Sequence, residues 1–224
     1  MLKPKKKLTK KDIKQDPFLE KVDKAEAYFE DNRQKIFQIL AVALALFIGY
    51  QFISNSNETK VLAANSKLSQ ALVAVEKGDK DNAVVQFESL IQEYASTDAG
   101  EIGHYYLGKI YFDQNNFSDA KNQLLKFVEF SSMPALVPPA YIMLAAISLN
   151  DNSIDEAISL YTKGKSKSTS NSQKNELSLY IAHAELSRGN IELARSIAQE
   201  ISNQEFVVDK FKNAAQEILG QTSS

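Results

Sequence analysis

A spacing of 37 residues recurs along the chain and limits the folds that it can adopt. Four alanines follow this spacing: Ala83, Ala120, Ala157 and Ala194. Twelve positions before each alanine lies a small residue: Ala71, Gly108, Ala145 and Ala182. Five positions before each alanine lies a turn-forming residue: Gly78, Asn115, Asn152 and Gly189. A fixed period of this length is typical of stacked helical pairs, so the sequence predicts an all-α repeat protein.

The short side chains have a physical role in this prediction. Two antiparallel helices can pack with their axes about 8–10 Å apart where one side chain from each is short. The first small residue falls in the first helix of each pair and the alanine falls in the second, so we expect the two to meet. We therefore predict an α-solenoid of about four helix pairs over residues 61–220, with residues 221–224 disordered.

Two segments outside the helical pairs have patterns of their own. Lysine and serine alternate over residues 163–170, between the third and fourth pairs, and this composition predicts a flexible basic loop. A terminal repeat needs a cap because its outer face has no neighbour. The last apolar set of the chain has helical spacing and predicts a C-terminal capping helix: Val207, Val208, Phe211, Ala214, Ala215, Ile218 and Leu219.

Residues 36–53 predict a membrane-spanning helix. The segment contains no charged residue and only two glutamines. Its 18 residues would form a helix of about 27 Å, close to the ~30 Å thickness of the hydrocarbon core. Charged residues flank the run at both ends, which disfavours the alternative of a buried core helix. Residues 54–60 would then be a polar linker to the repeats.

The charges on either side of this segment predict its direction. Residues 1–35 contain eleven Lys or Arg residues, whereas the 20 residues after the span contain only Lys60 and Lys67. The positive-inside rule therefore places residues 1–35 in the cytoplasm and the repeats across the membrane. A cleaved signal peptide would need a short amino-terminal region and small residues at a cleavage site, and neither is present.

The amino-terminal tail combines a lysine cluster with a short helical pattern. Asp16 and Pro17 suit a helix start, and apolar residues then recur at helical spacing from Phe18 to Phe29. This helix would either lie on the lipid headgroups or be a plain solvated helix, and the sequence leaves both open. No aromatic residues interleave with the lysines, so we expect no nucleic-acid binding.

Composition also disfavours catalytic and metal-binding functions. The chain has no Cys, which excludes disulfides, thiolate metal sites and cysteine nucleophiles. His104 and His183, its two histidines, fall in different repeats, so we expect no metal site. No glycine-rich phosphate loop, nucleophile–histidine–acid set or dinucleotide motif is present. We therefore expect a protein that is not an enzyme and binds no cofactor.

Two resemblances follow from particular motifs. The run His104–Tyr111 (HYYLGKIY), followed by Phe117–Ala120 (FSDA), resembles the tetratricopeptide repeat (TPR) consensus. This resemblance implies a right-handed α-solenoid. A basic tail, the stretch Tyr28–Lys35, one span and a repeat body together resemble the YfgM-like family of bacterial inner-membrane proteins. That resemblance implies a periplasmic repeat body, ancillary to the Sec translocon, that contacts exported chains or periplasmic chaperones.

In a TPR stack, the first helices of successive pairs line a concave groove. Apolar residues dominate the groove-facing positions in this sequence and predict a trough for an amphipathic helix or an unfolded segment. The alternative is that the capping helix or residues 55–64 fold back and cover these residues. The candidate protein-binding residues are Leu72, Val75, Tyr105, Lys109, Phe112, Ile142, Ala146, Leu149, Leu179, His183 and Leu186.

The sequence thus predicts a membrane-anchored, extracytoplasmic TPR protein that acts as a scaffold or chaperone-like adaptor, and the resemblance to the YfgM-like family implies that it acts during protein export. Its expected partners are translocon subunits, exported chains or periplasmic chaperones. The alternative is a structural envelope protein that assembles other membrane complexes or self-associates through the stack.

Overall fold

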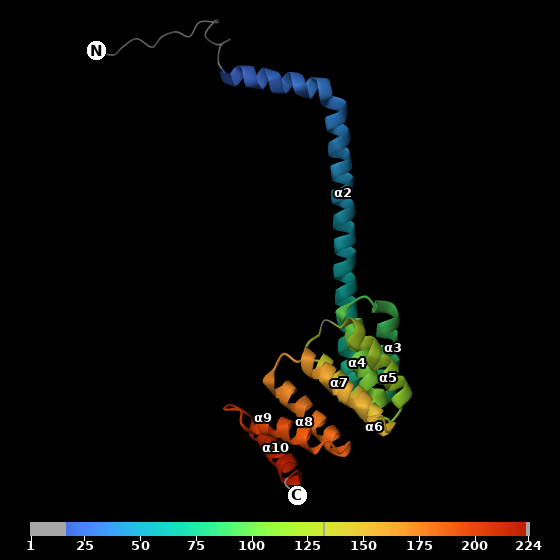
Figure 1. The fold of residues 1–224 in the computed structure, drawn as a ribbon. Helices are drawn as coiled ribbons and strands as arrows, with labels where there is room; N and C mark the ends of the chain where they lie inside the picture. Colours follow the sequence, from blue (N-terminus) through green and yellow to red (C-terminus); the bar gives the residue numbers. More distant parts are fainter. Residues whose placement is uncertain (1–16, 132, 223–224) are drawn as a thin grey trace, which may run out of the picture. The chain divides into compact units, whose positions relative to one another are not determined.

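The computed structural model describes the backbone of residues 17–131 and 133–222, and the side chains of these residues except 17–20, 49–56 and 130. The described residues form helices and contain no strand (Figure 1). The helices are α2 (Pro17–Glu76), α3 (Lys80–Tyr94), α4 (Asp98–Asp113), α5 (Phe117–Phe130), α6 (Val137–Asn150), α7 (Ile154–Lys167), α8 (Asn171–Ser187), α9 (Ile191–Ser202) and α10 (Asp209–Gln221).

The chain divides into two compact units, residues 1–59 and 60–224. In the first unit, the described backbone belongs to α2, which also runs through the predicted linker of residues 54–60. Its apolar side chains between Phe37 and Ile48 are exposed. Among the described residues, no helix is both long enough and apolar enough to cross a bilayer. The span over residues 36–53 stays a prediction, because the side chains of residues 49–53 lie outside those described.

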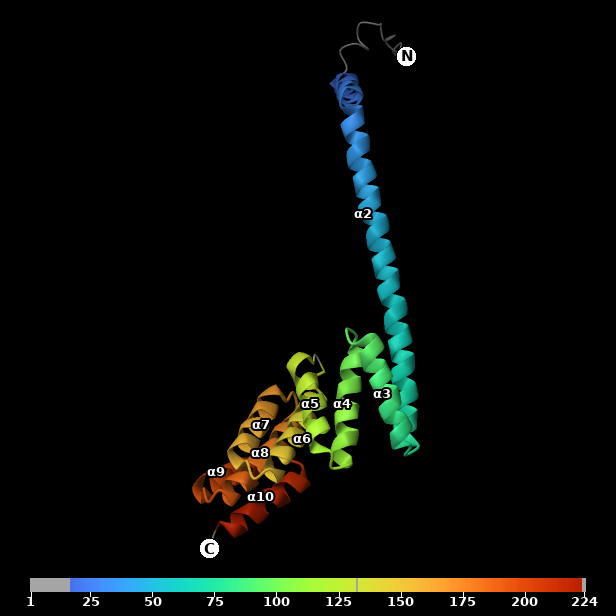
Figure 2. The same ribbon diagram turned by 90° about the vertical axis from the view of Figure 1, so that its right-hand side faces the viewer.

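The second unit contains the repeats, and its helices stack in chain order from α3 to α10 (Figure 2). The four alanines at the 37-residue spacing are all fully buried, as are Ala71, Ala145 and Ala182. At the remaining position of that set, a Cβ atom added to Gly108 would lie 2.8 Å from Leu124 Cγ. The short residues therefore lie at the contact between the helices of each pair, as predicted.

Each helical pair turns at a residue in the left-handed backbone region. The φ angles are 75° at Gly78, 59° at Asn115, 57° at Asn152 and 85° at Gly189. The next residue donates its N–H to the carbonyl five positions back, as Asn116 does to Tyr111 and Asn190 does to Glu185. This is the Schellman arrangement that ends a helix. Glycine and asparagine recur there because they tolerate positive φ best.

Three clusters of buried side chains form one continuous core. The first lies among α4 and α3 and the last turns of α2, the second extends from α4 to α8, and the third lies among α8, α9 and α10. Tyr106 and Tyr111 contact the first two clusters, and Ile197 contacts the last two. Phe211 and Ile218 of α10 are buried in the third cluster, so α10 caps the stack as the sequence predicts.

Two boundaries differ from the expectations. Residues 163–167, predicted as part of a flexible loop, are the last turns of α7. The next residue, Ser168, is buried and donates its hydroxyl to the Gly164 carbonyl at 2.9 Å. At the carboxyl end, α10 continues to Gln221, and the Thr222 carbonyl accepts a hydrogen bond from Arg195. Helix α10 therefore runs one residue past the predicted boundary at residue 220, and residues 223–224 lie outside the described part.

Candidate functional site

Two hollows open on the side of the stack that is formed by α4, α6, α8 and α10. The first has a volume of about 310 Å³ and the second about 270 Å³. The first is lined by Tyr105, Lys109, Phe112, Asp113, Pro139, Ile142, Met143, Glu176 and Tyr180. The second is lined by Glu176, Leu179, Tyr180, His183, Lys210, Phe211 and Ala214. Because Glu176 and Tyr180 line both, the hollows form one surface, which we call the trough.

The trough contains six of the predicted groove residues: Tyr105, Lys109, Phe112, Ile142, Leu179 and His183. The other five lie elsewhere. Leu72 and Val75 pack against the first core cluster, and Leu186 packs against the third. Ala146 is half-buried and Leu149 is exposed, and neither lines a hollow.

Eight trough residues were not predicted, and four of them follow from the repeat. Pro139 and Glu176 occupy one repeat position, 37 residues apart, and Met143 and Tyr180 occupy another. Pro139 and Glu176 lie three residues before Ile142 and Leu179, and such a residue shares a helix face with its neighbour. Adding the position three residues before each of these groove residues would have found Pro139 and Glu176. Lys210, Phe211 and Ala214 belong to α10, which lies outside the four repeats.

Aromatic rings behind the trough hold its aromatic lining in place. The rings of Tyr105 and Phe127 have centroids 5.3 Å apart. Those of Phe112 and Phe117 are 5.8 Å apart. Tyr180 stacks on Tyr161 of α7 at 5.2 Å, with only 13° between the ring planes. The lining residues therefore belong to the first helices, and each ring behind them comes from a second helix.

The tyrosines of the trough are neutral at physiological pH. Burial raises the pKa of Tyr105 above its ordinary value. Burial, together with the nearby Glu176 carboxylate, raises the pKa of Tyr180, and burial raises the pKa of Tyr161 behind it to about 12. A buried phenol resists ionisation because the phenolate loses its hydration. The neutral hydroxyls of Tyr105 and Tyr180, which line the trough, can therefore act as hydrogen-bond donors.

The charged groups of the trough differ in how they are paired. Lys109 Nζ lies 2.8 Å from Asp113 Oδ2, and Lys210 Nζ lies over the Phe211 ring, 4.5 Å from its centroid. No hydrogen bond or ion pair of Glu176 occurs within the described part of the chain. Across residues 17–131 and 133–222, no group of three or more His, Asp or Glu side chains is placed to hold a metal ion.

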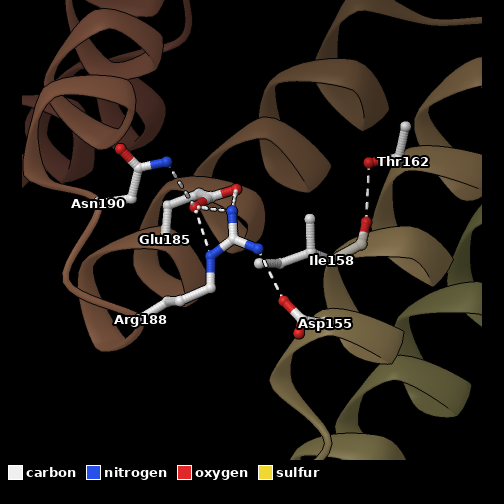
Figure 3. Close-up of polar contacts among 6 residues, drawn as sticks. All are labelled: Asp155, Ile158, Thr162, Glu185, Arg188 and Asn190. Atoms are coloured by element: carbon white, nitrogen blue, oxygen red, sulfur yellow. Dashed lines mark hydrogen bonds and ion pairs between the residues drawn. The ribbon is translucent and has the colours of Figure 1, made fainter.

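A polar network outside the two hollows joins the third and fourth repeats (Figure 3). Glu185 of α8 is only 2% exposed. Its carboxylate accepts hydrogen bonds from Arg188 Nε and Nη2, the shortest at 2.6 Å, and from Asn190 Nδ2 at 3.2 Å. Arg188 Nη1 also donates to Asp155 Oδ1 of α7 at 2.7 Å. These bonds to Asp155 and Glu185 raise the pKa of the Arg188 guanidinium, so its charge is permanent.

The repeat position of Glu185 in the fourth repeat is occupied by Tyr111 in the second repeat. Tyr111 donates its hydroxyl to Glu88 Oε1 of α3 at 3.1 Å. In both repeats, a polar group near this position thus contacts the second helix of the preceding pair. The arginine network therefore replaces a tyrosine contact and keeps neighbouring repeats in register.

Comparison with known proteins agrees with this geometry. A family model described as a tetratricopeptide repeat-like domain matches residues 26–178. No curated protein matches the chain in sequence. The fold is similar to the crystal structure of YrrB, described as a TPR protein with an unusual peptide-binding site, at a TM-score of 0.50 and 12% identity, over 70% of this chain and 82% of that chain.

A second solved structure is less similar. It comes from a functional characterization of Pseudomonas aeruginosa PilF, with a TM-score of 0.42 and 11% identity, over 73% of this chain and 90% of that chain. The match to the family model covers well over half of the sequence. The chain therefore belongs to the tetratricopeptide repeat-like domain family.

Proposed function

We propose that this protein is a scaffold or chaperone-like adaptor that holds other polypeptides in its trough. The observation that carries the proposal is the pair of joined hollows along α4, α6, α8 and α10, lined mainly by aromatic and aliphatic side chains. Concave surfaces of this kind suit an amphipathic helix or an extended segment. Residues of α2 line neither hollow, and α10 lines the end of the trough through Phe211.

The comparison with YrrB supports this reading at the level of the fold. That protein is described as having a peptide-binding site, and the two chains share a repeat architecture. A shared fold raises the expectation of a shared kind of ligand but names no partner. The argument for this chain therefore rests on the trough itself.

We further propose that α2 anchors the protein in the bacterial inner membrane as a single-pass helix, with the repeats in the periplasm. Support comes from the uncharged run of residues 36–53 and from the excess of lysine before it. The layout resembles the YfgM-like family, so the partners we propose are Sec translocon subunits, exported chains or periplasmic chaperones. Protease added to spheroplasts should digest the repeats and leave residues 1–35 intact.

Site-specific crosslinking tests the proposed partners. A photoreactive residue at Phe112, in the trough, should trap translocon subunits, exported chains or chaperones. The matched control is Leu125 on α5, which is 44% exposed and lines neither hollow. Crosslinks from Leu125 alone, or from neither position, would contradict a role for the trough.

A structural envelope scaffold is the second candidate function. Apolar side chains outside the trough favour it, since Val85 of α3 is 64% exposed and Ile191 of α9 is 48% exposed. Such exposed apolar side chains on second helices are available for self-association or for the assembly of other complexes. The size of the full-length protein in mild detergent distinguishes the two, because a self-assembling scaffold would be larger than one chain.

A further inference from the structure

We infer that the trough selects segments in which two apolar anchors flank a lysine or arginine, and that Glu176 receives this cation. The inference rests on the proposed function and deepens it by naming the chemistry of the partner. Glu176 lies on α8, is half-buried and lines both hollows. It is therefore the carboxylate that any segment crossing from one hollow to the other must pass.

The other carboxylate of the trough, Asp113, has an ion-pair partner, whereas Lys210 contacts an aromatic ring. Asp113 offsets Lys109 at 2.8 Å, and Lys210 lies over the Phe211 ring with its side chain exposed to water. Glu176 makes no ion pair or hydrogen bond within the part of the chain that the structure describes. Among the carboxylates that line the two hollows, Glu176 is therefore the one without an ion pair in the described part of the chain.

Covering the trough changes the environment of this carboxylate. An apolar segment seated over Ile142 and Tyr180 would remove water from Glu176, and an ionised carboxylate without water or a partner is costly. A cation on the segment offsets that cost, whereas a carboxylate on the segment adds repulsion. The apolar lining thus supplies affinity, and Glu176 supplies selectivity.

The spacing of the helices sets the spacing of the anchors. Neighbouring helix axes in a packed stack lie about 10 Å apart, so hollows on the two sides of α8 are separated by about that distance. A segment in the polyproline II conformation covers it in about three residues at ~3.1 Å each, and its side chains three positions apart lie on the same side. The preferred segment therefore has two large apolar residues three positions apart, with the lysine or arginine between them.

Labelled peptides and the full-length protein in lipid nanodiscs test this inference by fluorescence anisotropy at low salt. The first peptide carries two leucines three positions apart with an arginine between them, set in glycine and serine. The second has glutamine in place of the arginine. We expect the arginine peptide to bind the wild-type protein about fivefold more tightly. Glu176→Gln should abolish this preference, and Glu176→Lys should reverse it.

Glu129→Gln is the matched control, since Glu129 is an exposed acid on α5 that lines neither hollow. It should keep the fivefold preference. Equal binding of both peptides to the wild-type protein, weakened by Phe112→Ala, would overturn the inference and leave the proposed function standing. Binding of neither peptide would count against both. Affinity that falls as protein concentration rises would overturn the inference by showing that a second copy fills the trough.

Discussion

Ala120 of α5 is fully buried and packs in the core cluster that extends from α4 to α8. Gly108 of α4 faces the same helix, with Leu124 at contact distance of any added Cβ. A leucine at residue 120 would have to displace the helix opposite or adopt a strained rotamer. The short side chains thus set how closely the two helices of a pair approach.

Ala120→Leu should therefore destabilise the protein by about 1–3 kcal/mol through overpacking. Asn122→Leu is the control, because residue 122 is an exposed position of the same helix. We expect that control to change the free energy of unfolding by less than about 0.5 kcal/mol. Urea unfolding of both variants measures the difference, and equal effects would contradict the packing argument.

Two substitutions at one turn residue should change the melting temperature in opposite directions. Asn152 has a φ angle of 57°, a conformation that costs a residue with a Cβ roughly 1 kcal/mol. Asn152→Gly should raise the melting temperature because glycine adopts this conformation without strain. Asn152→Ala should lower the melting temperature, since alanine lacks the local hydrogen bonding that helps asparagine. Thermal unfolding tests both, and a stabilising alanine would show that the turn is not strained.

The repeat explains why residues of this kind could be predicted. Each pair makes the same helix contact and the same turn, so the same residue types recur every 37 positions. The basic segment at residues 163–170 has no such recurrence, and its composition alone was misleading. There, Gly164 allows α7 to approach Tyr141, whose Cβ would lie 2.9 Å from an added Cβ, and Lys165 and Lys167 suit the negative end of a helix dipole.

At the scale of the helices, the half-buried ring of His104 between α4 and α5 makes the stability of the fold depend on pH. The Nδ1 of His104 lies 2.7 Å from Gln123 Oε1, so the ring donates to this oxygen. Burial lowers the pKa of His104 below its ordinary value of 6.5. Just below pH 6.5, the unfolded chain therefore binds a proton that the folded chain does not bind. Stability is lost as pH falls from about 6.5 through the lowered folded-state pKa.

His104→Gln should remove this part of the pH dependence. The variant keeps a polar side chain near Gln123 and cannot gain a proton, so its melting temperature should fall less between pH 7.5 and pH 5. His183→Gln, at an exposed position of α8, should behave like the wild-type protein. Parallel curves for wild type and His104→Gln would show that burial of this ring has no effect on stability.

The candidate site could be predicted from the sequence only in part. Positions facing the groove in one repeat recur in the next, and this placed Tyr105, Ile142 and Leu179 in the trough. The end of the trough formed by Lys210 and Phe211 could not be found in this way, because α10 lies outside the 37-residue period. The network around Glu185 and Arg188 was also not predicted. It stands where the second repeat has the single contact of Tyr111, so the 37-residue pattern does not indicate it.

At the scale of the whole molecule, each repeat contacts only its neighbours, and stability should therefore vary along the stack. Phe211 is 5% exposed and seals the outer side of the last pair. Phe211→Ala should cost about 3 kcal/mol. Hydrogen exchange should become faster in α8 and α9, while α3 and α4 keep their protection. Uniformly faster exchange in all helices would indicate one cooperative unit instead.

Two hollows share the side chains of one helix, α8, because Glu176 and Tyr180 each border both. Each first helix added to the stack would in the same way border two hollows, one on each of its sides. Duplication of a single 37-residue unit would then lengthen the binding surface by one subsite and leave the existing subsites unchanged. Evolution could lengthen the ligand that such a chain accepts by copying a gene segment, without redesigning any contact.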